Sequence, residues 1–249
     1  MTFNPAWVTL LSDRFWRDAG GRDVPLDQAI SLGTTLVRVA LPRLRPEAID
    51  DYLQRWGIAP RLDGTSGRLH GCLVVSSGRG IVFVEGSDPP AEQKFTLAHE
   101  LAHFLADYQR PRERAIALLG PAIREVLDGE RPPTDAERVQ AALRDAPVGP
   151  YLDLFDYDDL ANLAHESDAD KLALELIAPA DQALVLAAGT GTMPAALRER
   201  ALAVALVDRY QLPAPVAAQY ALRLLSALEL DVPSGWLSHL AARVGRIEE

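Results

Sequence analysis

Apolar residues recur at helical spacing over most of the chain, and this pattern dominates the N-terminal segment. From Met1 to Gly57 the pattern is helical throughout. Pro46 followed by Glu47 is typical of a first helical turn, where proline loses no hydrogen bond and an acidic side chain faces unpaired N–H groups. We expect two or three helices in this N-terminal segment, which we define as residues 1–60.

Two short runs rich in β-branched residues interrupt the helical pattern. They read GCLVV at 71–75 and GIVFVE at 80–85, on either side of the turn-forming residues Ser76 to Arg79. Runs of this length around a glycine-containing turn are typical of a β-hairpin. The sequence therefore predicts a small antiparallel sheet.

A strong helix-start signal follows the hairpin. Asp88 fits the N-cap position and Pro89 fits the first helical position. We expect this helix to run from Pro89 to about Tyr108 and to end before Pro111, because proline cannot donate a backbone hydrogen bond.

Beyond Pro111 the pattern remains helical, with breaks where proline and glycine occur. We expect a core domain at 61–180 that contains a helical insertion at 110–156. A helical C-terminal region is expected at 181–249. Helices around one small sheet make α+β the predicted fold class.

Composition narrows the class of protein. The chain has 249 residues, of which 48% are hydrophobic and 24% charged, as in globular rather than disordered proteins. The single cysteine, Cys72, excludes an internal disulfide and fits a reducing compartment. No apolar run approaches the roughly 18 residues of a membrane span, and the N-terminus lacks a secretion signal. We therefore expect a cytoplasmic protein without membrane association.

The formal net charge of −10 disfavours nucleic-acid binding by bulk electrostatics, because a phosphate backbone attracts clustered lysine and arginine. A C-terminal helix-turn-helix that reads DNA is an alternative, suggested by two helical stretches around Tyr210 to Leu225. Those stretches carry only Arg209 and Arg223 as cations, too few to follow a phosphate backbone.

The segment FTLAHELAHFL, Phe95 to Leu105, places two histidines and a glutamate in an otherwise apolar helix. Residues four apart stack on one helical face, so His99 and His103 point the same way. Two imidazoles at this spacing can bind one zinc ion, and Glu100 can reach a water molecule on its open side. The motif predicts a catalytic zinc site better than it predicts two core histidines and a surface glutamate.

A catalytic zinc site needs a third protein ligand. The formally available donors include many carboxylates and the side chains of His70, Cys72, His165 and His239. The helical segment HESDADKLALELIAP at 165–179 is the best source, because it carries Glu166 and Asp170 on one face. We expect Glu166 to bind the metal and Asp170 to accept the second N–H of a zinc-bound histidine. His165 is the second choice, since a helix turns it away from that face.

Together the two motifs resemble those of the ImmA/IrrE family of bacterial metallopeptidases. That family has a helical H-E-x-x-H after a β-hairpin and a downstream helix with the pattern E-x-x-A-[ND]-x-[FL]-A-x-x-L-[LI]-x-P. Every specified position of the second motif is met between Glu166 and Pro179. The resemblance is strong over 69–105 and 166–179 and looser elsewhere.

The resemblance implies a zincin-like peptidase domain with Zn²⁺ as its cofactor. By position, His99, His103 and Glu166 would be the ligands and Glu100 the base that takes a proton from the attacking water. Two features depart from the family pattern. The last two ligands are 63 positions apart (166 − 103), which is longer than usual, and Asp170 stands where asparagine is usual.

Family members typically inactivate a partner repressor that has a helix-turn-helix domain, so the resemblance implies such a repressor as substrate. The negative net charge suits a basic partner. The acidic run at Asp153 to Asp159 is either a solvated helix N-terminus, which is the favoured interpretation, or an acidic rim that would add to the attraction. The strand at 80–85 is expected to hold the substrate extended, which places the cut in a linker or loop. We also expect low basal activity and a trigger, with single-stranded DNA as a candidate.

Alternatives remain open at several points. The protein could instead be a binding module that sequesters a transcription factor without cleavage, in which case Glu100 would be dispensable. Cys72 could cap the metal as a thiolate in a latency switch, or it could be a small buried hydrophobic residue. The candidates for the group that stabilises the transition state are Tyr108, Tyr151, Tyr157 and His165.

Overall fold

The computed structural model describes residues 3–58, 68–144 and 160–231. Its first elements are α1 (Ala6–Asp18), α2 (Leu26–Gly33), β1 (Leu36–Leu41), α3 (Pro46–Arg55), β2 (Gly71–Ser76) and β3 (Arg79–Glu85). There follow α4 (Pro90–His103), the π-helix η1 (Phe104–Gln109), α5 (Arg110–Leu119), the 3-10 helix η2 (Pro121–Ile123), α6 (Arg124–Leu127) and α7 (Asp135–Leu143). The last elements are α8 (Leu160–Ile177), α9 (Ala180–Gly189), α10 (Ala195–Tyr210) and α11 (Ala214–Asp231).

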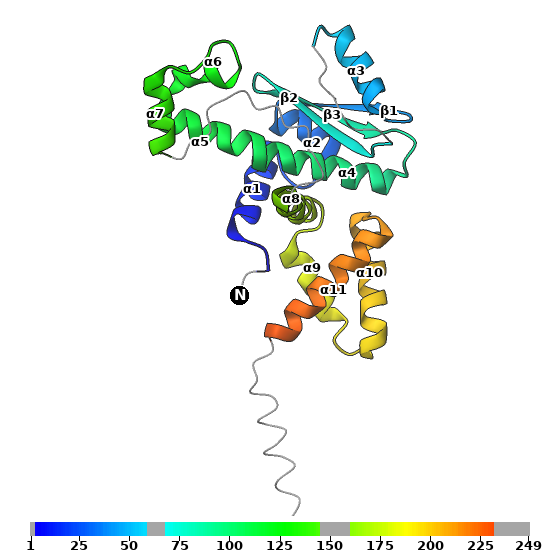
Figure 1. The fold of residues 1–249 in the computed structure, drawn as a ribbon. Coiled ribbons are helices and arrows are strands. Elements are labelled where there is room, and N and C mark those ends of the chain that lie inside the picture. Colours follow the sequence, from blue (N-terminus) through cyan, green and yellow to red (C-terminus); the bar gives the residue numbers. More distant parts are fainter. Residues whose placement is uncertain (1–2, 59–67, 145–159, 232–249) are drawn as a thin grey trace, which may run out of the picture. The chain divides into compact units, whose positions relative to one another are not determined.

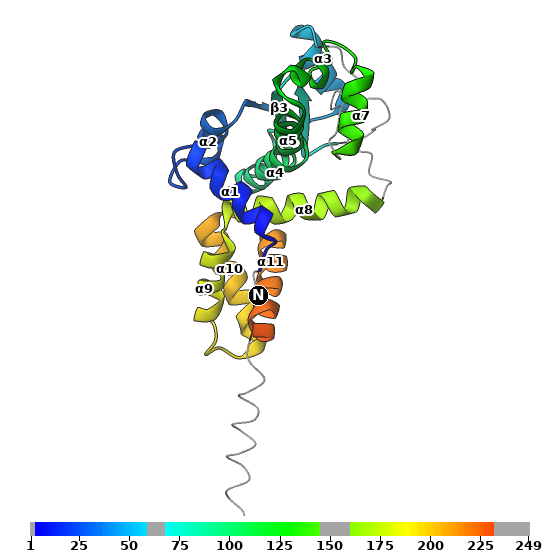
Figure 2. The same ribbon diagram turned by 90° about the vertical axis from the view of Figure 1, so that its left-hand side faces the viewer.

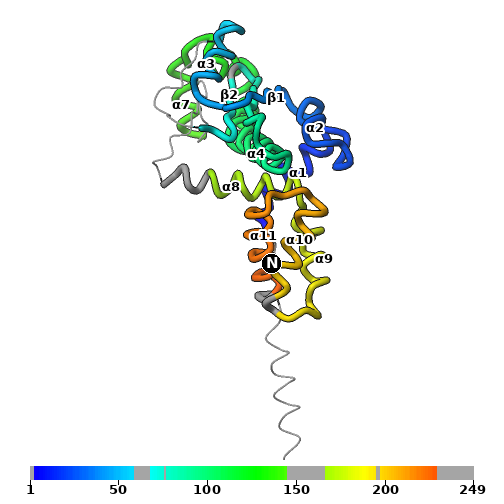
Figure 3. The backbone as a smooth tube through the Cα atoms, turned by 90° about the vertical axis from the view of Figure 1, so that its right-hand side faces the viewer, coloured from blue at the N-terminus to red at the C-terminus, as the bar shows by residue number. Residues whose placement is uncertain are grey.

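The chain divides into two compact units. One comprises Ala6–Ile177 and holds the sheet together with α1 to α8, while the other comprises Met1–Pro5 and Ala178–Glu249. In the second unit, α9, α10 and α11 lie side by side (Figure 3). The hydroxyl of Tyr220 on α11 donates a hydrogen bond of 3.0 Å to the carbonyl of Ala178, just before α9. The finer division into an N-terminal segment, core and insertion remains a prediction.

The helices of the described residues differ from membrane spans in length or hydropathy. No single helix there is long and apolar enough to cross a bilayer. The broken pair Glu166–Ile177 and Ala180–Gly189 passes by length and composition alone.

The sheet has three strands in the order β1-β3-β2, with β1 parallel and β2 antiparallel to β3. The α+β class is confirmed, but the sheet is mixed rather than wholly antiparallel. The purely helical N-terminal prediction missed β1, although Val37 and Val39 are β-branched residues that favour a strand. The partner strand of β1, at 79–85, is distant in sequence. The expectation that the strand at 80–85 would bind a substrate is also wrong, because β3 is central and paired on both edges.

Helices cover both faces of the sheet. Figure 1 shows α3 on one face and α4 on the other, and Figure 2 shows α8 crossing α4 on the side away from the sheet. The main hydrophobic core lies on the α4 side of the sheet, among the sheet, α4 and α8, and includes Leu73, Leu101 and Leu172. At the end of α8, Ser12 and Trp16 of α1 donate side-chain hydrogen bonds to backbone carbonyls. These contacts fix α8 against the rest of the unit.

The helix that begins at Pro90 does not end at Tyr108 as predicted. It passes from α4 through η1 into α5, so Pro111 lies within a continuous helical run. Proline lacks an N–H and its ring clashes with the carbonyl four residues earlier in an α-helix. The wider π-helical turn changes that spacing just before the proline, which allows the helix to continue.

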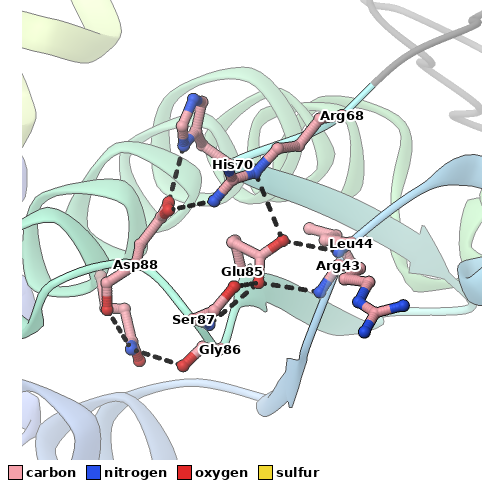
Figure 4. Close-up of polar contacts among 9 residues, drawn as sticks. Arg43, Leu44, Arg68, His70, Glu85, Gly86, Ser87 and Asp88 are labelled. Atoms are coloured by element: carbon pink, nitrogen blue, oxygen red, sulfur yellow. Dashed lines mark hydrogen bonds and ion pairs between the residues drawn. The ribbon is translucent and has the colours of Figure 1, made fainter.

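Glu85, at the end of β3, is a buried carboxylate that joins two turns (Figure 4). It accepts hydrogen bonds from the backbone N–H groups of Arg43 (2.9 Å) and Leu44 (2.7 Å), between β1 and α3. It also accepts from the hydroxyl and the backbone N–H of Ser87, just before α4. The Ser87 hydroxyl contributes most to lowering the pKa of Glu85 from 4.5 to about 2, and the backbone donors outweigh the opposing effect of burial.

Asp88 is not the N-cap that the sequence predicted. Its carboxylate accepts a hydrogen bond of 2.7 Å from Arg68 and lies 2.6 Å from Nδ1 of His70 (Figure 4). The helix begins one residue later than expected, at Pro90, and its cap residue Pro89 makes no side-chain hydrogen bond. The carboxylate of Asp88 is therefore engaged by side chains before β2 rather than by the first turn of α4.

Glu85→Gln is expected to destabilise the protein at neutral pH, because the amide would turn an NH₂ group towards N–H donors. The depressed pKa means that the carboxylate stabilises the fold above about pH 4.5. This contribution is lost as the pH falls towards about 2. Urea unfolding of wild type, Glu85→Gln and the exposed control Glu130→Gln between pH 7 and pH 3 measures it. A difference that does not change with pH would contradict the assignment.

Candidate metal centre

The two histidines of the α4 motif meet side by side, as their spacing predicts. The rings of His99 and His103 lie 4.8 Å apart between centroids, and their Nε2 atoms are 3.1 Å apart. The side chain of His103 is only 2% exposed. Glu100 is 9% exposed, and burial raises its pKa, an effect that the charges of the two histidines oppose. The helix thus holds two imidazoles and one carboxylate in a largely enclosed site.

α8 brings a third group to the two histidines. One carboxylate oxygen of Glu166 lies 3.1 Å from Nε2 of His99, and the other lies 3.5 Å from Nε2 of His103. One ligand atom from each of the three residues lies within 4.8 Å of the others. Among the residues described, no other group of three such side chains converges in this way.

The outer nitrogens of both rings face carboxylates. Nδ1 of His99 lies 3.0 Å from Asp170 on α8, and Nδ1 of His103 lies 2.8 Å from Asp107 in η1. A carboxylate favours a proton on the nitrogen that faces it. In the neutral form of each imidazole, which is the form that binds a metal, the lone pair is therefore on Nε2, and the two Nε2 atoms face each other and Glu166.

This arrangement fits a zinc ion. Two nitrogens bound to one tetrahedral zinc at about 2.0–2.1 Å would be roughly 3.3 Å apart, close to the separation of the two Nε2 atoms. Burial lowers the pKa of His99, but hydrogen bonds to Asp170 and Glu166 outweigh it and raise the pKa to about 10. The same carboxylates make the site electronegative, as a metal cation requires.

Asp107 was missed in the sequence analysis. It follows His103 by four positions, and it is an acidic residue in the otherwise largely apolar run FLADYQ, so helical spacing could have revealed it. Its contact with Nδ1 of His103 matches the contact of Asp170 with His99. Each histidine thus has its own carboxylate partner.

Asp107→Asn is expected to lower the affinity for zinc by about 10–100-fold, because the carboxylate no longer orients His103 or raises its basicity. Competition with a chromophoric zinc chelator measures this without reference to activity. Asp168→Asn on α8, whose carboxylate pairs with Lys171, is the matched control and should keep wild-type affinity. Equal affinities for the two variants would remove Asp107 from the metal centre.

Cys72 lies on the other face of the sheet from the main core. Leu73 and Val75 of β2 pack into that core, whereas Cys72 packs into the cluster beneath α3. Burial, followed by the charges of Glu100 and Asp50, raises the pKa of the thiol to about 12. This placement favours the interpretation of Cys72 as a small buried residue, and the latency switch remains a prediction.

Of the four candidates for stabilising the transition state, only Tyr108 has a side chain within the described part of the chain. The hydroxyl of Tyr108 accepts a hydrogen bond of 2.7 Å from the N–H of Gly78, which directs it towards the β2–β3 turn. Tyr151, Tyr157 and the side chain of His165 lie outside the described part of the chain, as does the acidic run at Asp153 to Asp159.

Comparison with known families agrees with the motif analysis. Residues 59–142 match the Peptidase_M78 family model, described as an IrrE N-terminal-like domain. The match spans about a third of the chain and includes His99, Glu100 and His103, whereas Glu166 lies beyond it. It confirms the predicted resemblance to the ImmA/IrrE family and indicates a metallopeptidase. No curated protein and no solved structure matches the chain significantly.

Proposed function

Because residues 59–142 resemble an IrrE N-terminal-like domain, we propose that the protein is a zinc-dependent endopeptidase that cleaves a partner repressor. The observation that carries the proposal is the convergence of His99, His103 and Glu166 beside the buried carboxylate of Glu100. Two imidazoles and one carboxylate, with a glutamate next to them, are the donor set of a catalytic zinc site rather than a structural one.

The chain's own residues have separate roles in this proposal. Zinc bound by the three ligands would act as a Lewis acid, making a water molecule acidic and stabilising charge on the substrate carbonyl. Glu100 takes the proton from the attacking water and returns it to the leaving amine. Asp170 and Asp107 hold the imidazoles of His99 and His103 in the required tautomer.

The edge strand β2 is the element suited to hold an extended substrate. It lies at the end of the strand order, and in the described part of the chain it pairs with β3 alone. Strand addition along β2 would lead a peptide past Gly71, which lies against Glu100. A substrate bound in this way must be extended, so the cut falls in a linker or flexible loop.

The substrate we propose is a cytoplasmic repressor with a helix-turn-helix domain. Support comes from the family resemblance and from the net charge of −10, which suits a basic DNA-binding partner. Limited cleavage would separate the domains of the repressor and derepress its operon. Permanent activity would leave no repression, so cleavage requires a trigger, for which single-stranded DNA is a candidate.

Incubation with candidate helix-turn-helix regulators encoded beside the gene tests this function. With zinc present, mass spectrometry should find two discrete fragments of one regulator, and operator binding should be lost. A zinc chelator should prevent both changes. Degradation of unrelated unfolded proteins, with every candidate regulator intact, would instead indicate a housekeeping peptidase.

A further inference from the structure

Gly71 begins β2 at the point where the sheet meets the catalytic helix. A Cβ atom at this position would lie 2.6 Å from the carboxylate oxygen Oε1 of Glu100 and 2.4 Å from the methyl carbon of Thr96. Side-chain carbons do not approach other heavy atoms this closely. The carboxylate of Glu100 therefore occupies the space that any side chain at position 71 would fill.

The backbone of Gly71 faces the outer edge of β2, along which no strand of the described residues pairs. The N–H of Glu85 donates to the carbonyl of His70 (2.9 Å), so these two residues form a hydrogen-bonded pair. Bonded and non-bonded pairs alternate along antiparallel strands. Gly71, opposite Val84, therefore directs its own N–H and C=O away from β3. The glycine that contacts Glu100 also offers a donor and an acceptor to a chain lying along β2.

We infer that Gly71 is a positioning residue of the active site. Because Gly71 has no side chain, the carboxylate of Glu100 can lie directly against β2, the strand proposed to bind the substrate. This inference rests on the proposed peptidase function. A methyl group at position 71 would push Oε1 of Glu100 back by about 0.8 Å to reach an ordinary contact of 3.4 Å (3.4 − 2.6). A misplacement of about 1 Å in a catalytic group can cost about 10²-fold in rate.

Gly71→Ala tests the inference, with Gly80→Ala as the matched control. A Cβ at Gly80 would lie 2.4 Å from a methyl carbon of Leu36, an equally close contact made within the core rather than with Glu100. Both variants should lower the thermal midpoint and keep the wild-type zinc content. With a peptide spanning the bond cut in the repressor, Gly71→Ala should reduce kcat by about 10²-fold with little change in KM. Gly80→Ala should keep the wild-type kcat per zinc-loaded chain.

The double variant Gly71→Ala, Thr96→Ser separates the two contacts of the added methyl group. Serine lacks the methyl carbon of Thr96, so the double variant should regain stability while kcat stays low; it also replaces Gly71→Ala if that variant is insoluble. Recovery of kcat in the double variant, or a wild-type kcat in Gly71→Ala, would overturn the inference while leaving the peptidase function intact. Absence of cleavage by the wild-type protein would instead remove the proposed function, and this inference with it.

Discussion

Glu100→Gln is expected to reduce cleavage of the repressor by about 10²–10⁴-fold, the range that general acid–base catalysis contributes. Glutamine keeps the size of the side chain and cannot accept the proton of the attacking water. Zinc content should remain at the wild-type level, since the three metal-binding side chains are untouched. Single-turnover assays with the repressor, together with elemental analysis of the same samples, measure both quantities.

Glu92→Gln is the control for this change, because Glu92 lies in the first turn of the same helix. It should cleave at the wild-type rate. If Glu100→Gln still inactivates the repressor without cutting it, the protein belongs with the binding modules that sequester a transcription factor. If it cuts at the wild-type rate, another group must handle the proton.

His103→Ala and Glu166→Ala are expected to weaken zinc binding by more than the 10–100-fold caused by losing an outer partner such as Asp107. Each variant removes one of the three side chains that converge on the site. Chelator competition measures the affinities, and cleavage activity should fall with zinc occupancy. Asp168→Ala, two positions from Glu166 on the same helix, is the control.

Full zinc affinity in Glu166→Ala would show that the third ligand lies elsewhere. His165 would then be the first residue to test, as the second choice of the sequence analysis. Wild-type zinc affinity in His103→Ala would show that the H-E-x-x-H motif does not bind the metal.

The candidate site was visible in the sequence because local geometry produces most of it. A four-residue spacing on a helix places His99 and His103 on one face without any knowledge of the fold. The same rule placed Glu166 and Asp170 on one face of a second helix. Helical spacing does not show that the two helices meet. That contact was inferred from the need of a catalytic zinc ion for a third protein ligand and from the resemblance to known motifs.

Features that depend on distant partners were missed. β1 is a strand because it pairs with β3, about forty residues later, and its own sequence showed no sheet partner. That pairing also makes β3 the central strand and leaves β2 at the edge beside Glu100. Asp88 looked like an N-cap because the rule considers only the following helix, whereas Arg68 and His70 engage its carboxylate.

Gly71 shows a further limit of sequence analysis. In the sequence, a glycine at the start of a β-branched run indicates only a turn before the strand. Its importance depends on the carboxylate of Glu100, which lies 29 positions away (100 − 71) on another element. Close approach between a strand and a helix is a property of packing, so only the structure reveals it.

Anomalous diffraction at the zinc absorption edge, from crystals of the zinc-loaded protein, would locate the metal. We expect one strong peak per chain, within about 2.0–2.2 Å of Nε2 of His99, Nε2 of His103 and a carboxylate oxygen of Glu166. A zinc peak bound by other side chains, or no peak between these three residues, would contradict it.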